Sequence, residues 1–217
     1  MRLDGRNLGG YRLDLAGDFN YANALAAVAI AHAAGVPASE VGSLHAMETT
    51  HVLGRMERYR DEANDTDVIV DYAHNHVSVK ALLDFVDARY AGRDPIITLV
   101  AGSAGDKALD RRQEIVEAAQ DRIARFVFTA EDTDTEPYEA ICRDMLSHVT
   151  NPNVATSMII DRVAAITDAL DEARAHPERT DVVLVIGKGD ERWIKDRNKH
   201  MPYEGDDRVV ERLLASR

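Results

Sequence analysis

The sequence contains one cysteine, Cys142, among its 217 residues. A single cysteine excludes an intramolecular disulfide and is typical of a protein from a reducing compartment. No apolar run approaches the roughly 20 residues that a membrane-spanning helix needs. The stretch Met1–Gly10 is polar and has no apolar signal segment. We therefore expect a cytoplasmic protein that makes no membrane contact.

Basic residues are too few to balance the acidic ones. There are 26 Lys and Arg against 38 Asp and Glu, which gives a formal net charge of −12. A field of that sign repels phosphate backbones and anionic lipid, so we expect no nucleic-acid or membrane partner. It still permits a local cationic pocket for a small anion such as a nucleotide.

Several motifs that define catalytic cores are missing. The chain has neither the G-x-G-x-x-G of a dinucleotide fold nor the G-x-x-x-x-G-K-[ST] of a P-loop. It also lacks the G-x-S-x-G elbow of a serine hydrolase. His74 and His76 flank Asn75, but no third ligand stands at a suitable spacing. We therefore predict no metal site in this chain.

The first 54 residues do not form a complete domain pattern. Residues 21–34 are almost all helix formers and are followed by Gly35 and Pro37, which end helices. A second helix is expected over about 38–47. Two helices with a short leader bury too little surface for a domain. We interpret them as the end of a domain whose beginning lies outside this sequence.

After Gly54, apolar strands alternate with amphipathic helices. Strands are predicted at 55–60, 67–71, 96–101, 126–129, 154–160 and 182–186, and helices at about 76–90, 107–121, 136–148 and 161–174. This alternation predicts an α/β fold with a mostly parallel sheet and helices on both faces.

Four polar or glycine-rich loops follow the predicted strands. They are D-Y-A-H (71–74), G-S-A-G-D-K (102–107), E-D-T-D (131–134) and G-K-G-D-E (187–191). Each one alone is also explained as an ordinary strand-to-helix turn. Because sheets of this kind bind ligands beyond the carboxyl ends of their strands, four such loops at one edge predict a site.

Five short motifs, in order and at matching spacing, resemble those of the Mur ligase family. They are Gly17–Ala27 with F-N-x-x-N-A-L-A-A, Gly54–Glu57 (G-R-M-E), Asp71–His74 (D-Y-A-H), Gly105–Lys107 (family G-D-R) and Gly187–Glu191 (family G-K-G-H-E). Each motif is weak alone, but five in register from about residue 15 to 205 are specific. The last indicates the tripeptide-synthetase branch.

This resemblance implies a domain organisation. Family members have a UDP-substrate domain, a central P-loop ATPase domain and a Rossmann-like C-terminal domain. Residues 1–54 would be the end of the ATPase domain, and residues 55–217 the C-terminal domain. The P-loop and the Mg²⁺ ligands would then lie in missing parts, so we expect this chain alone to be inactive.

The resemblance also implies a reaction. ATP phosphorylates a substrate carboxylate, and the amine of an amino acid then attacks the acyl phosphate to form an amide. The expected partners are ATP, an amino acid and a UDP-N-acetylmuramoyl-peptide, and we expect a monomer. The added amino acid would become the third residue of a peptidoglycan precursor.

Positions matching the family's nucleotide contacts are carried over one by one. Asn20 and Asn23 would hydrogen-bond the adenine edge, since an amide both donates and accepts. Arg55 would reach the phosphates. Asp71 would bind the ribose hydroxyls, and His74 would lie against the base. Capping of the first helix by Asn20 is the structural alternative.

The amino-acid pocket would be formed by the other loops, with the substrate-binding residues Lys107, Glu131, Asp132, Asp134, Gly187 and Glu191. Lys107 stands where the family has an arginine that pairs with the amino acid's carboxylate, and lysine lacks the bidentate fork. Asp190 replaces the usual histidine.

Asp134 falls on the arginine of the D-N-P-R motif that diaminopimelate-adding enzymes use for the distal carboxylate. Two carboxylates about 4 Å apart repel by on the order of 4 kcal/mol at an effective dielectric near 20. We therefore predict that the loop selects a cationic amino acid, L-lysine or L-ornithine. A solvated acidic surface loop is the alternative.

Other functions fit parts of the pattern. The chain could be a non-catalytic module that binds a nucleotide or an amino acid, or an α/β hydrolase-like enzyme. Folylpolyglutamate and cyanophycin synthetases are amide-forming relatives that share some of these motifs, but they fit the G-K-G-x-E loop less well.

Overall fold

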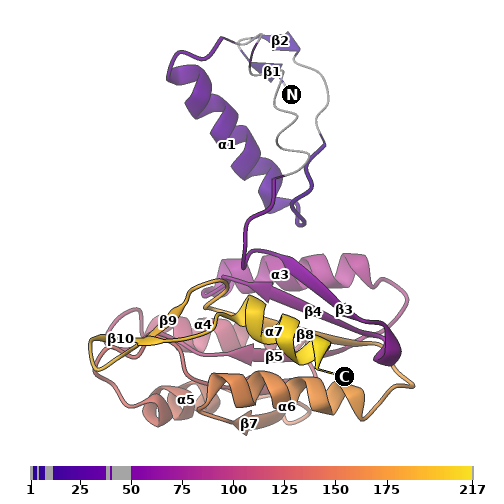
Figure 1. Cartoon of the computed structure of the whole chain (residues 1–217), viewed down its shortest axis with the longest axis vertical. Helices are drawn as coiled ribbons and strands as arrows, with labels where there is room; N and C mark the ends of the chain where they lie inside the picture. The colour runs from indigo at the N-terminus through magenta and orange to yellow at the C-terminus, as the bar shows by residue number, and fades with distance from the viewer. Residues whose placement is uncertain (1, 4, 8–11, 38–39, 41–49, 217) are drawn as a thin grey trace. The chain divides into compact units, whose positions relative to one another are not determined.

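The computed structural model describes residues 2–3, 5–7, 12–37, 40 and 50–216. The chain divides into two compact units, Met1–Val52 and Leu53–Arg217, and each is described by itself (Figure 1). Across the described ranges, every helix is too short or too polar to span a bilayer.

The Met1–Val52 unit is built around helix α1, Phe19–Ala33. Alanine, the strongest helix former, recurs along it. The helix ends where Gly35 takes a φ of +98°, a conformation that glycine adopts without strain. Two short antiparallel strands, β1 (Arg2–Leu3) and β2 (Arg6–Asn7), precede it. The predicted helix at 38–47 lies almost entirely outside the described residues.

The Leu53–Arg217 unit contains a six-stranded sheet in the order β3-β4-β8-β5-β6-β7. β3 and β4 are antiparallel, and all other neighbours are parallel. The strands are β3 Glu57–Asp61, β4 Thr66–Asp71, β5 Ile96–Ala101, β6 Arg125–Phe128, β7 Ala155–Met158 and β8 Asp181–Ile186. β8, the last of them in the chain, is inserted between β4 and β5.

Helices cover both faces of this sheet (Figure 1). Helices α6 and α7 pack on one face, where Val68, Val183 and Val185 join the core with Ile166 and Val209. Helices α3, α4 and α5 pack together on the other. Their bounds are α3 His76–Arg89, α4 Asp110–Ala119, α5 Tyr138–Ser147, α6 Arg162–Arg174 and α7 Asp206–Ala215. The strands alternate their side chains between two apolar layers, as a doubly covered sheet requires.

The predicted α/β fold with helices on both faces is confirmed, and the predicted elements lie within a few residues of the observed ones. Two features after β8 were not predicted. An antiparallel hairpin of β9 (Trp193–Asp196) and β10 (Lys199–Pro202) follows the glycine loop, and helix α7 follows the hairpin. The hairpin lies outside the main sheet, so its residues are not buried between helices. Its sequence is therefore polar and lacks the apolar run that predicts a buried strand.

Candidate functional site

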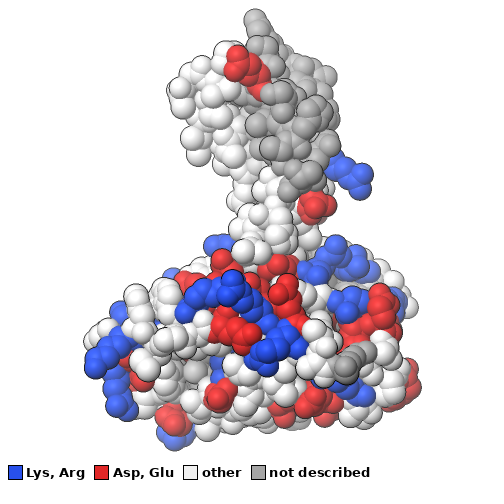
Figure 2. All heavy atoms as spheres, in the orientation of Figure 1, with Lys and Arg blue, Asp and Glu red and all other residues white. Residues whose placement is uncertain are grey.

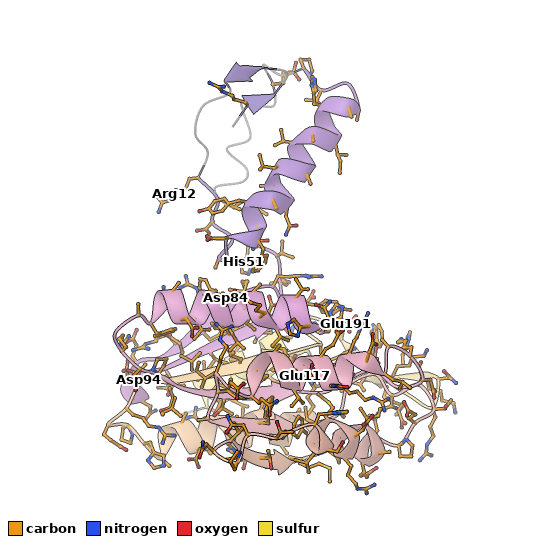
Figure 3. The ribbon with its side chains drawn as sticks, turned by 180° about the vertical axis from the view of Figure 1, so that it is seen from behind. Arg12, His51, Asp84, Asp94, Glu117 and Glu191 are labelled. Carbon is orange, nitrogen blue, oxygen red and sulfur yellow. The ribbon has the colours of Figure 1, made fainter. Side chains whose placement is uncertain are left out.

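The four predicted loops gather at one edge of the sheet. Parallel register pairs Asp71 with Ile186 at the ends of β4 and β8, and Gly187 N donates to Asp71 O at 3.1 Å. Thr129 N likewise donates to Ala101 O at 3.0 Å. In Figure 3, Glu191 lies at this carboxyl edge, and Asp94, which precedes β5, lies at the opposite one. The loops therefore form one surface.

Glycines allow these loops to touch. A Cβ on Gly105 would lie 1.8 Å from Thr133 O. A Cβ on Gly54, whose φ is +64°, would lie 2.2 Å from Asp190 N. Both clashes are with backbone atoms, which cannot swing away as a flexible side chain can. The glycines of the G-R-M-E and G-D-K motifs therefore serve loop-to-loop contact as well as turning the chain.

Asp71 holds the start of this surface in place. It is 8% exposed, and its two oxygens accept from Met56 N and Ala73 N, each at 2.8 Å. Burial raises the pKa of Asp71, against the effect of these two hydrogen bonds. The carboxylate thus ties the segment that carries Arg55 to the loop after β4.

Arg55 and two aromatic rings lie together beside Asp71. The exposed Arg55 guanidinium lies 4.6 Å from the centre of the Tyr72 ring. The Tyr72 and His74 rings meet edge to face at 5.3 Å, and His74 Nδ1 is 2.8 Å from Tyr72 O. Arg55, Asp71 and His74, all predicted nucleotide contacts, are thus brought together, with Tyr72 added to them.

Asn20 and Asn23 belong to the Met1–Val52 unit. Asn20 donates from its amide to Ala16 O at 2.7 Å, and Asn23 donates to Asn20 Oδ1 at 2.9 Å. No side-chain hydrogen bond caps the N-terminus of α1. The capping alternative for Asn20 is therefore wrong, and its amide bonds the preceding turn.

Lys188, a residue not predicted from the sequence, is the centre of a charge network. Its side chain is 1% exposed, and Nζ lies 2.9 Å from Asp132 Oδ1 and in contact with Glu191 Oε2. The ammonium also lies 4.2 Å from the Trp193 ring centre. Two carboxylates and an aromatic face compensate this buried cation.

Glu191 connects this network to the Arg55 side of the surface. Tyr72 donates from its hydroxyl to Glu191 Oε1 at 3.2 Å, while Lys188 contacts the other oxygen. The predicted residues Glu191 and Asp132 are therefore brought together through Lys188. Nothing in the structure explains the exposed Asp190.

Asp134, the residue predicted to select a cationic amino acid, forms ion pairs within the chain. It is 7% exposed. Lys107 Nζ lies 3.4 Å from Oδ2, and the Lys195 ammonium contacts Oδ1. Lys195 and Lys107 hold the pKa of Asp134 below its ordinary value, against desolvation. Lys107, from the loop after β5, and Lys195, from β9, thus compensate the charge of Asp134. Its role in selecting the amino acid stays a prediction.

Glu131 differs from the other carboxylates of this surface in its partners. Among the described residues, no lysine or arginine forms an ion pair with it, whereas Asp132, Asp134 and Glu191 each contact a lysine. It lies against Gly187, where an added Cβ would be 2.4 Å from Oε2. Burial raises the pKa of Glu131 to about 7, although Arg162 and Lys188 oppose the shift.

A buried ion pair lies beneath the surface. Arg162, 2% exposed, donates to both oxygens of Asp206 at 2.7 Å. The same guanidinium donates to Ala130 O at 3.1 Å and to Ile186 O at 2.6 Å. Through these hydrogen bonds, Arg162 connects the carboxyl ends of β6 and β8 to helix α7. The loop that carries Glu131 starts at the end of β6, and the loop that carries Gly187 starts at the end of β8.

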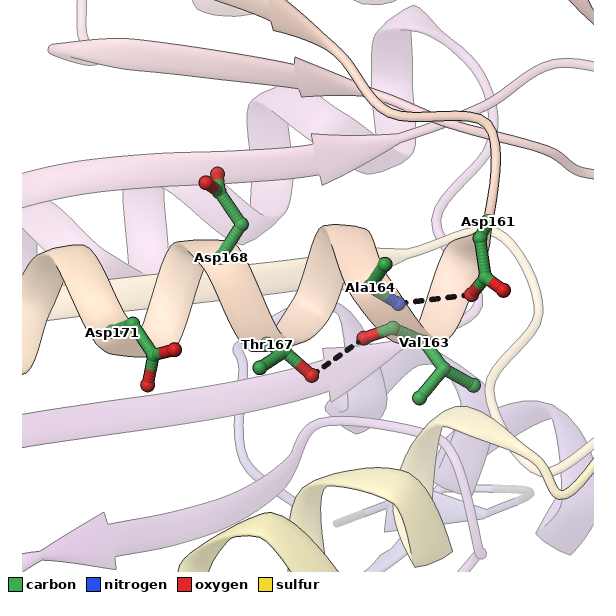
Figure 4. A pocket seen from close by; sticks show the side chains of 6 residues that line it. All are labelled: Asp161, Val163, Ala164, Thr167, Asp168 and Asp171. Carbon is green, nitrogen blue, oxygen red and sulfur yellow. Dashed lines mark hydrogen bonds between the residues drawn. The ribbon is translucent and has the colours of Figure 1, made fainter.

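Other surface features do not join the site. A shallow hollow of about 500 Å³ runs along α6, lined by six residues (Figure 4). There Asp161 caps the helix by accepting from Ala164 N at 2.9 Å. Figure 2 shows acidic and basic side chains interspersed over the visible face of the Leu53–Arg217 unit. Within the described residues, no group of three His, Cys, Asp or Glu could hold a metal ion.

The sequence matches a known family and its members. Residues 54–189 match the family described as "Mur ligase, glutamate ligase domain". The UDP-N-acetylmuramyl-tripeptide synthetase of Bifidobacterium longum is 58% identical over 208 residues, covering 96% of this chain and 40% of that protein. The UDP-N-acetylmuramoyl-L-alanyl-D-glutamate–L-lysine ligase of Enterococcus faecalis is 33% identical, covering 95% and 39%. The chain thus spans about 40% of the length of these relatives.

Solved structures give the same picture of the fold. A UDP-N-acetylmuramoyl-L-alanyl-D-glutamate–2,6-diaminopimelate ligase is 25% identical with a TM-score of 0.64, covering 94% of this chain and 39% of that chain. Mycobacterium tuberculosis folylpolyglutamate synthase, complexed with ADP, is 22% identical with a TM-score of 0.57, covering 81% and 39%. At that identity, the second likeness concerns the fold alone.

Proposed function

The chain belongs to the Mur ligase family, and from this premise we propose that it is the C-terminal part of an ATP-dependent tripeptide synthetase. The whole enzyme would add the third residue to a UDP-N-acetylmuramoyl-dipeptide in the cytoplasm, as a monomer. Residues 1–54 would end the ATPase domain, and residues 55–217 would form the C-terminal domain. The named relatives that cover most of this chain support this assignment.

The observation that carries the proposal is the gathering of charged loops at the carboxyl edge. An incoming amino acid brings an ammonium, a carboxylate and a side chain, and these loops offer both signs of charge within one surface. In the proposed site Arg55 contacts phosphate oxygens, and Asp71 positions Arg55 while binding ribose. His74 would contact the base. For Asn20 and Asn23, the contact with the adenine edge stays a prediction from the sequence. Mg²⁺ would be held by parts of the enzyme outside this chain.

These residues would act by binding and orientation. The amide-forming step needs the amine held in line with an acyl phosphate, and positioning of this kind supplies much of the rate of such reactions. We assign the amino acid to Lys107, Glu131, Asp132, Gly187 and Glu191, with Lys188 fixing the carboxylates.

We further propose that the added amino acid is L-lysine or L-ornithine. Among the described residues, Glu131 forms no ion pair with a lysine or arginine, although Arg162 and Lys188 act on its charge. We propose Glu131, in place of Asp134, as the counter-ion of the side-chain ammonium. The lysine ligase of Enterococcus faecalis, 33% identical, supports a cationic substrate.

A direct test compares the isolated 217-residue chain with the full-length protein. We expect the full-length protein to release ADP and form an amide, and the isolated chain to do neither, because it lacks a P-loop. Nucleotide turnover by the isolated chain that survives repurification would contradict the assignment. A full-length protein that binds ATP without forming an amide would support the non-catalytic module instead.

The nucleotide side has its own test in the full-length enzyme. Replacing Asp71 with alanine removes a ribose contact and the tie to Arg55, so the KM for ATP should rise about ten- to a hundred-fold. The KM for the amino acid should change much less. Steady-state kinetics with each substrate varied separately measures this split. An unchanged ATP dependence would remove Asp71 from the nucleotide site.

A further inference from the structure

Two lysines share the single carboxylate of Asp134. Lys107 comes from the loop after β5 and faces Oδ2, while Lys195 comes from β9 and faces Oδ1. The Asp134 side chain is 11% exposed, whereas the side chains of Lys107 and Lys195 are 57% and 29% exposed. Both lysine side chains are thus more exposed to solvent than the carboxylate that they share.

Other acidic side chains near this trio have different partners. Asp106 accepts from Thr135 N at 2.7 Å. Glu136 accepts from Asp106 N at 2.7 Å and contacts Arg112. Asp132 accepts from Lys188. The donors to Asp106 are neutral, so its negative charge remains beside the trio. What the trio offers an anion is therefore hydrogen-bond donors: each ammonium has three N–H donors, and the two ammonium groups share one carboxylate.

The backbone fixes where the Lys195 side chain begins. Lys195 N donates to Asp132 Oδ1 at 2.8 Å, and Lys195 O accepts from Thr133 N at 2.8 Å. The β9 strand is thus hydrogen-bonded to the loop that carries Asp134. Lys195 therefore starts from a fixed backbone position, although its side chain is long and flexible.

We propose that Lys195 acts with Lys107 to bind the α-carboxylate of the incoming amino acid. The inference rests on the proposed function and adds a residue from outside the recognised motifs. One ammonium is a point charge without the planar fork that an arginine offers to a carboxylate. A second ammonium, held beside the first by Asp134, restores two donors for the two oxygens.

The test uses the amino acid that the full-length enzyme accepts best, and the α-carboxamide of the same amino acid. The carboxamide keeps the shape of the α-carboxylate without its charge. For the acid, Lys195→Met should raise KM about ten- to a hundred-fold, since a charge-assisted hydrogen bond is lost. For the carboxamide, KM should change by less than about threefold. Lys195→Arg should restore most of the preference for the acid.

Lys199→Met, an exposed position on β10 of the same hairpin, is the control and should affect neither substrate. The ratio of the two KM values does not depend on the fraction of folded enzyme. If Lys195→Met raises both KM values equally, Lys195 only supports Asp134 and the inference is wrong. If the unmodified enzyme forms no amide with any amino acid, the proposed function itself fails.

Discussion

Replacing Asp206 with asparagine is expected to lower the free energy of unfolding by about 3–5 kcal/mol, because the substitution leaves the Arg162 cation buried and uncompensated. Both side chains of the pair are at most 1% exposed. Asparagine retains one acceptor but no charge, and it presents an amide donor toward a guanidinium. Urea unfolding followed by the fluorescence of Trp193, the only tryptophan of the sequence, measures the change.

A more exposed ion pair, between β6 and helix α6, is the matched control. Arg125 and Asp168 are 2.5 Å apart, but Asp168 is 40% exposed. Exposed pairs contribute at most about 1 kcal/mol, so Asp168→Asn should change stability by less than that. Equal effects of the two substitutions on stability would mean that water reaches Arg162. The Arg162–Asp206 pair would then not be what connects the strand ends to helix α7.

In the full-length enzyme, Glu131→Gln is expected to remove most of the preference for a cationic amino acid. A carboxylate about 4 Å from an ammonium gains on the order of 4 kcal/mol at an effective dielectric near 20, before desolvation. The net loss should be smaller, about 1.5–3 kcal/mol, so the KM for lysine or ornithine should rise about ten- to a hundred-fold. Steady-state kinetics with a neutral isostere such as norleucine, run in parallel, separates charge from shape.

The pH dependence gives a second measurement of the same residue. Burial raises the pKa of Glu131 to about 7, so its carboxylate becomes charged as pH rises through 7. The KM for the cationic amino acid should fall over this pH range, and Glu131→Gln should abolish that pH dependence. The raised pKa also means that ionisation of Glu131 lowers stability as pH rises from its ordinary pKa toward 7. The variant should therefore be at least as stable as the unmodified enzyme at pH 8.

Asp134→Asn is the matched control for Glu131→Gln. Lys107 and Lys195 already compensate Asp134, so its removal should reduce lysine selection less than removal of Glu131 does. If Asp134→Asn has the larger effect and Glu131→Gln has none, the original sequence-based hypothesis for Asp134 is the better one.

The sheet and its site edge could be predicted because their signals are local. Val182–Ile186 is apolar throughout and Ile96–Ala101 is apolar except for Thr98, and a buried parallel strand needs such a composition. Polar or glycine-rich loops after such runs must meet at one edge, whatever the strand order. The insertion of β8 between β4 and β5 has no local signal, since it depends on how the helices pack.

The charge pairing could not be predicted, because the partners lie far apart in sequence. Lys188 between two glycines has the pattern of an exposed loop residue, and only the fold places Asp132 and Trp193 against it. The partners of Asp134 come from the loop after β5 and from strand β9. Helix α7 could have been found, since Val209, Val210, Leu213 and Leu214 follow helical spacing.

The most direct test of the proposed ligase activity and its specificity is a competition assay. It contains the full-length protein, ATP, UDP-N-acetylmuramoyl-L-alanyl-D-glutamate and equal amounts of L-lysine, L-ornithine and meso-diaminopimelate. Mass spectrometry of the nucleotide-linked product identifies the residue that is added. We predict one new amide to lysine or ornithine, with ADP formed in equal amount. A product that contains diaminopimelate would contradict the proposed specificity, and the absence of any amide-linked product would contradict the ligase assignment.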